Sequence, residues 1–120
     1  FASETRSYST LIRDNEGISI GNVYADADLS DNTRINLTFF DSSKLSDITS
    51  IRYSIYDNNG YSVDNEASFV PQPMSTGNTN YYLYSIPEAI TNEGIYFISL
   101  QFFKGDKVID ETTLEYRLIY

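Results

Sequence analysis

One stretch near the end of the chain constrains the fold more than any other. It begins Asn92-Glu93-Gly94-Ile95-Tyr96 and runs directly into the apolar-rich segment 97–103. Glycine and asparagine are turn residues, whereas aromatic and β-branched residues are typical of strands. The pattern therefore predicts a tight corner that feeds a long β-strand, with Tyr96 two residues after Gly94.

A tyrosine at this spacing resembles the tyrosine corner of immunoglobulin-like sandwiches. In that corner the ring packs inward and its hydroxyl bonds to backbone a few residues upstream. We therefore expect Tyr96 to be buried and to bond to backbone within residues 87–93, with Gly94 and Tyr96 in structural roles. Antibody domains have a cysteine two residues after the tyrosine, where this chain has Ile98. The similarity covers the corner and not the disulfide.

Apolar and polar residues alternate in short runs along most of the chain, separated by clusters of Gly, Asn and Asp. This is the signature of an all-β protein. The clearest strands are predicted at 35–39, 51–55, 95–103 and 108–119, with weaker ones at 7–12, 18–23 and 81–86 and short strand candidates at 61–63 and 67–70. We predict a two-sheet immunoglobulin-like β-sandwich of seven to eight strands without a disulfide, with a small barrel as the alternative. The residues predicted to form most of its core are Ile35, Leu37, Phe39, Ile51, Tyr53, Ile55, Ile98, Leu100, Leu114 and Tyr116.

The length of 120 residues indicates one domain, which can bury about two-thirds of its unfolded surface. Residues 1–12 are expected to form an extended N-terminal arm or an edge strand. Because the chain begins with Phe1 and not Met, we expect a processed product or an excised part of a longer protein.

Composition excludes several classes of function. The chain has no histidine and no cysteine, so Ser–His and Cys–His nucleophile systems are impossible within it. Its net charge of -9 disfavours nucleic acid and anionic membranes as partners. No apolar run approaches the ~20 residues of a transmembrane helix, so no membrane insertion is expected. We predict neither enzymatic activity nor a cofactor, and interpret the acidity as discouraging self-association.

The second half of the chain resembles the immunoglobulin-like N-terminal module of phage baseplate upper proteins. The resemblance spans about residues 33–119 and is carried by Ile51 to Tyr56, Asn59-Gly60, Tyr82 to Ile90, Gly94-Ile95-Tyr96 and the hairpin from Leu100 to Leu118. It implies a structural module of a virion, in a phage tail or baseplate, that assembles with other proteins of the particle or as a homo-oligomer. It brings no catalytic residues.

Three acidic residues in 26–32 raise the question of a metal site. Asp26, Asp28 and Asp31 could supply carboxylate oxygens to Ca²⁺. Their spacing is not that of an EF-hand loop, because the glycine and the closing glutamate are absent. The preferred interpretation is a solvated acidic loop without metal.

Contact residues are predicted around the segment 71–78. Its prolines and glycine predict an exposed loop that interrupts the sheet. Pro71, Pro73 and Met74 in that loop, and Tyr81 and Tyr82 beside it, are the candidate interaction residues. The predicted function is a non-catalytic assembly module of a virion. The alternative is a bacterial cell-surface or secreted module that binds a glycan or a host protein, so the expected location is a virion or the extracellular surface.

Overall fold

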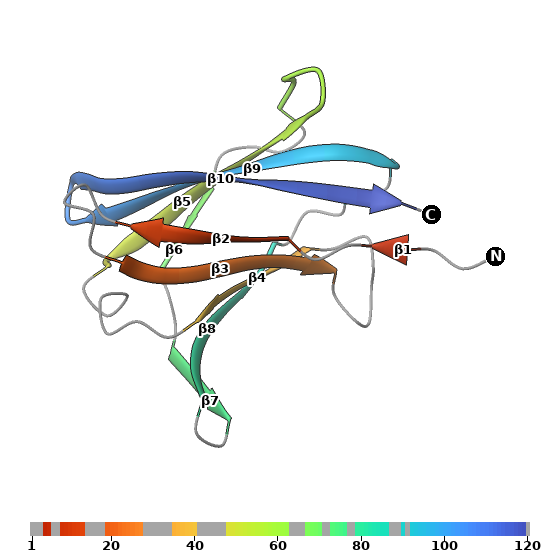
Figure 1. Ribbon diagram of the computed structural model, residues 1–120. Helices are drawn as coiled ribbons and strands as arrows, with labels where there is room; N and C mark the ends of the chain where they lie inside the picture. The colour runs from red at the N-terminus through yellow and green to blue at the C-terminus, as the bar shows by residue number, and fades with distance from the viewer. Residues whose placement is uncertain are drawn as a thin grey trace.

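The computed structural model describes residues 4–5, 8–13, 19–27, 35–40, 48–62, 67–70, 73–76, 79–86, 90 and 92–119. Within these ranges the regular structure is entirely β (Figure 1). The ten strands are β1 (Glu4–Thr5), β2 (Tyr8–Arg13), β3 (Ser19–Ala27), β4 (Ile35–Phe40), β5 (Ser50–Asp57), β6 (Ala67–Phe69), β7 (Pro73–Thr76), β8 (Thr79–Ser85), β9 (Gly94–Lys104) and β10 (Lys107–Ile119).

The strands form two antiparallel sheets. Sheet A has the order β1-β10-β9-β5-β6, and sheet B has the order β2-β3-β4-β8-β7. In Figure 1 sheet A is the upper layer, with β9 and β10, and sheet B is the lower layer, with β3, β4 and β8. The two hydrogen-bonded ladders are separate, so the protein is a sandwich and not the alternative small barrel.

Eight of the strands have an immunoglobulin-like order. The four strands β3-β4-β8-β7 face the four strands β10-β9-β5-β6, which correspond to A-B-E-D and G-F-C-C′ of the immunoglobulin fold. The predicted two-sheet immunoglobulin-like sandwich is therefore confirmed. The described total is ten strands because the N-terminal segment adds one edge strand to each sheet. β1 pairs with β10, and β2 pairs with β3.

The core lies between the sheets, and all ten residues predicted for it are buried. Strict alternation places them there, as in β4, where every second residue is buried. The core also contains Tyr96, whose burial was predicted from the corner, and further residues that the sequence did not single out: Ile12, Val23, Ala25, Ile48, Ile86, Ile90, Phe102 and Leu118. Sheet B therefore contributes core side chains from β2 and β3 as well as from β4, whose alternation is clear in the sequence.

Five aromatic rings join the two sheets and are here called the aromatic cluster: Phe39 and Tyr84 from sheet B, and Tyr53, Phe69 and Phe102 from sheet A. Phe69 and Tyr84 are stacked, with ring centroids 3.9 Å apart and planes 2° apart. Tyr84 also lies 5.6 Å from Tyr53, and Phe39 meets Phe102 edge to face at 6.2 Å. Offset and edge-on ring pairs stabilise a fold beyond the area they bury.

The tyrosine corner forms as the sequence predicts. Tyr96 is 5% exposed, and its hydroxyl donates a hydrogen bond to the backbone carbonyl of Asn92 at 2.5 Å. Gly94 is the first residue of β9, so the corner sits where the chain leaves sheet B and enters sheet A. The hydrogen bond thus fixes the geometry of the crossing.

Candidate contact surfaces

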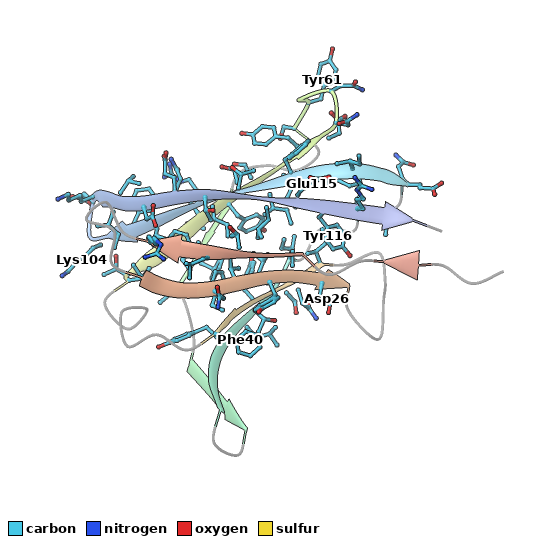
Figure 2. The ribbon with its side chains drawn as sticks, in the orientation of Figure 1. Asp26, Phe40, Tyr61, Lys104, Glu115 and Tyr116 are labelled. Carbon is cyan, nitrogen blue, oxygen red and sulfur yellow. The ribbon has the colours of Figure 1, made fainter. Side chains whose placement is uncertain are left out.

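The outer face of sheet B carries four large apolar or aromatic side chains from four strands: Leu11, Tyr24, Phe40 and Leu83. Leu11 is 46% exposed and Leu83 is 36% exposed. Tyr24 and Phe40 meet edge to face with ring centroids 5.3 Å apart. Figure 2 shows Phe40 on the side of sheet B that points away from sheet A.

The register explains why these side chains gather. Asn22 of β3 lies between Leu11 and Phe40, and Thr38 of β4 lies between Tyr24 and Leu83. Residues that face the same side of adjacent strands are close enough for their side chains to interact. The four strands therefore present one continuous surface.

The centre of this face holds no charge among the described side chains. Its other members are Asn22, Asn36, Thr38 and Ser85, and the Ser85 hydroxyl donates to Asn36 Oδ1 at 2.7 Å. Among the charged side chains that the structure describes in this region, the exposed Arg13 and Asp26 lie at opposite ends of the β2–β3 pair. The described centre of this face is therefore uncharged, although the chain carries a net charge of -9.

The outer face of sheet A is different, because charged residues lie beside several of its apolar ones. Phe97 of β9 lies between Tyr56 and Glu115, and Ile95 lies opposite Arg117. The long stems of charged side chains cover apolar surface while the charged groups stay in water. This face therefore shields much of its own apolar area.

Polar contacts hold the charged side chains of sheet A in place. Gln101 Nε2 donates to Glu111 Oε1 at 2.7 Å, and Arg117 Nε lies 3.4 Å from Glu115 Oε1. The Arg52 guanidinium lies over the Phe103 ring, 5.2 Å from its centroid. These exposed contacts suit a surface that stays in solvent.

A shallow depression of about 300 Å³ lies beside the Arg52–Phe103 pair, near the turn that joins β9 to β10. Thr49 fixes this turn, because its Oγ1 donates to the carbonyl of Phe103 and accepts from the N–H of Gly105. Asp106 lines the depression together with Arg52. Its wall thus combines both signs of charge and does not select one kind of ligand.

The turn after β5 presents the most exposed large aromatic side chain among the described residues. Asp57 Oδ1 accepts hydrogen bonds from the backbone N–H groups of Asn59 and Tyr61. Gly60 supplies the positive φ, +85°, that the turn needs, as the Asn59-Gly60 pair predicts. Tyr61 is 71% exposed and projects away from both sheets in Figure 2.

The predicted exposed loop at 71–78 is wrong in its central part. Residues Pro73–Thr76 form strand β7, which pairs with β8 at the edge of sheet B. Proline is tolerated there because it is the first residue of an edge strand, where its missing N–H breaks no central ladder. Met74 is therefore a strand residue, whereas Pro71 and the other predicted loop residues 72, 77 and 78 lie outside the described residues.

The structure separates the two candidate tyrosines of β8. Tyr82 is half-buried and packs against the core. Tyr81 occupies the register position opposite Phe40, on the row that also contains Leu11.

The acidic candidates do not form a described metal site. Asp26 belongs to strand β3 and not to the predicted loop, because β3 extends to Ala27 in register with β4. Asp28 and Asp31 lie outside the described residues. The described part of the chain contains no group of three or more acidic side chains placed to hold a metal ion.

The sequence did contain a signal for the outer face of sheet B. Each of its four apolar residues stands next to an inward apolar residue in its strand, as in Leu11-Ile12 and Phe39-Phe40. Because neighbours in a strand point to opposite faces, each such doublet places one large apolar side chain outside.

Comparisons with family models, with curated proteins and with solved structures give no match for this chain. Among the residues that the structure describes, no helix has the length and apolar character needed to cross a membrane.

Proposed function

We propose that this domain is a non-catalytic module that works by protein–protein contact. The observation that carries the proposal is the outer face of sheet B, where Leu11, Tyr24, Phe40 and Leu83 form an apolar surface with no charge at its centre among the described side chains. Interface cores are depleted of charge and enriched in aromatic residues, with charged and polar residues at the rim. Arg13 and Asp26 hold the rim positions here.

The setting that we propose is an assembled particle, such as the tail or baseplate of a phage. The sequence resemblance to baseplate modules supports this setting, and the sandwich supplies the rigid scaffold that an assembly module requires. The partners are then other structural proteins of the same particle or further copies of this chain.

The test compares particles assembled with the natural chain and with a Leu83→Glu chain. A charge at the centre of an apolar contact is expected to remove most of the chain from purified particles, as measured by quantitative mass spectrometry. Tyr56→Glu, on the outer face of sheet A, is the matched control, because Tyr56 is 37% exposed. Deletion of residues 72–78 is a poorer test because it removes β7.

Normal incorporation of the Leu83→Glu chain would take this face out of the assembly contact. Turnover of a sugar or peptide substrate by the pure domain would overturn the proposal entirely. Specific binding to a glycan or to a host protein, with no retention in particles, would favour the cell-surface alternative.

A further inference from the structure

We propose that the outer face of sheet B binds the same face of a second copy of this chain, which gives a two-fold symmetric dimer. This inference rests on the proposed contact function and names the first partner. The sequence left other particle proteins and further copies of this chain both open as partners.

Charge is the first argument for a second copy. Two molecules that each carry a net charge of -9 repel one another wherever their acidic surfaces meet. The outer face of sheet B is a place where two copies can approach without opposing like charges, because its central side chains are apolar, amide or hydroxyl groups. The acidity of the chain as a whole is therefore compatible with self-association through this face.

The rim charges are the second argument, because they are self-complementary. Arg13 and Asp26 lie at opposite ends of the β2–β3 pair. Consider a two-fold axis that lies in the plane between the two facing sheets and runs perpendicular to their strands. It places each end of a strand in one copy over the opposite end of the same strand in the other copy. Such an axis brings Arg13 of each copy toward Asp26 of the other, as a self-complementary two-fold interface requires.

The size of the outer face of sheet B indicates how strongly two copies are expected to bind. Six-residue strands such as β2 and β4 are about 20 Å long, and five strands about 4.8 Å apart span about 19 Å. Two such faces would together bury roughly 800 Å², which is the range of weak, transient contacts. We therefore expect a weak dimer with a dissociation constant on the order of micromolar or above.

The test is sedimentation equilibrium of the 120-residue chain over a concentration series that extends to several hundred micromolar. The natural chain should rise from monomer toward dimer mass. Leu83→Glu should raise the dissociation constant by about tenfold or more, because it places like charges at the dimer interface. Tyr56→Glu should leave the dissociation constant unchanged. Circular dichroism and thermal melting show that each variant is folded, and Leu11→Glu on β2 replaces Leu83→Glu if the latter unfolds.

A mixture of two variants gives a readout that a folding defect cannot imitate. Leu83→Glu and Leu83→Lys should each be monomeric, and an equimolar mixture should recover dimer because opposite charges then meet across the two-fold axis. A monomer at every concentration would overturn the proposal, as would equal weakening by Tyr56→Glu. If the chain is monomeric but Leu83→Glu is still lost from particles, self-pairing is wrong and the contact function stands with a different partner.

Discussion

The outer faces of the two sheets have the same strand geometry and different surfaces. On sheet A, Glu115 and Arg117 share rows with Phe97 and Ile95, and Arg52 lies over Phe103. On sheet B, the rows that contain Leu11, Tyr24, Phe40 and Leu83 have only uncharged neighbours among the described side chains. The placement of charged residues therefore leads to a self-shielded face in sheet A and a more open described face in sheet B.

The difference shows that exposed apolar residues are informative only together with their cross-strand neighbours. Scattered apolar residues on a surface are normal, whereas a contiguous patch rimmed by polar residues marks an interaction site. The predictions below test whether the inner faces are equivalent, how the two sheets are joined, and whether the outer faces differ as described.

The largest expected effect concerns the inner faces of the two sheets, which should contribute equally to the free energy of unfolding. Leu37→Ala in sheet B and Leu100→Ala in sheet A should each lower the free energy of unfolding by about 2–5 kcal/mol, because both side chains are fully buried. Urea denaturation measures this change. Thr38→Ala, on the outer side of the same strand as Leu37, is the control and should change stability by less than about 0.5 kcal/mol. A loss in only one sheet would mean that the sheets differ in their cores as well as outside.

The next effect concerns the crossing between the sheets. Tyr96→Phe removes the hydroxyl that donates to the carbonyl of Asn92 and leaves the rest of the ring in place. We expect a loss of about 1 kcal/mol or more in the free energy of unfolding, since a part-buried hydrogen bond is lost. Thermal denaturation measures this loss. If the variant is as stable as the natural chain, the Tyr96 hydrogen bond does not help to hold the two sheets together.

Salt is expected to have a smaller effect, on the dissociation constant of the proposed dimer through the outer face of sheet B. Between about 0.1 M and about 1 M NaCl the Debye length falls from about 10 Å to about 3 Å, so repulsion between two acidic chains weakens. The dissociation constant of the proposed dimer should therefore fall a few-fold, which is less than about 1 kcal/mol. Sedimentation equilibrium at the two salt concentrations measures it. A dimer that weakens strongly in salt would instead indicate that ion pairs dominate the contact, either the Arg13–Asp26 pairs at the rim or contacts through the charged outer face of sheet A.

The smallest effect is expected on the outer face of sheet A. Arg117→Gln breaks the exposed pair with Glu115 and should change the free energy of unfolding by less than about 0.5 kcal/mol. The dissociation constant of the dimer should not change. If this variant weakens the dimer as strongly as Leu83→Glu does, the contrast between the two faces has no functional meaning.

Much of the fold could be predicted because alternation is a local property. In β4, Ile35, Leu37 and Phe39 are inward by periodicity alone, and the Gly94-x-Tyr96 spacing predicted the corner. Strand β7 could not be predicted in this way. Pro73 is normally a sheet breaker, and only its place at the start of an edge strand makes it acceptable.

The contact surface was predicted less well because it depends on register. Tyr81 and Tyr82 are adjacent in sequence, and the sequence could not decide which of them points outward. Apolar doublets occur in both sheets, for example Phe39-Phe40 in β4 and Phe102-Phe103 in β9. Only pairing shows that Phe103 lies under Arg52 while Phe40 lies beside Tyr24. Side chains from four strands cannot be assembled into one surface without that information.

The aromatic cluster gives the molecule a built-in optical probe. The chain has eleven tyrosines and no tryptophan, so its ultraviolet signal comes mainly from tyrosine. Tyr53 of sheet A and Tyr84 of sheet B lie with ring centroids 5.6 Å apart, and Tyr84 is stacked on Phe69. Near-ultraviolet circular dichroism depends on fixed aromatic surroundings, whereas the far-ultraviolet signal depends on the backbone. The first signal therefore reports whether the two layers remain in contact, and the second reports whether the strands persist, without any added label.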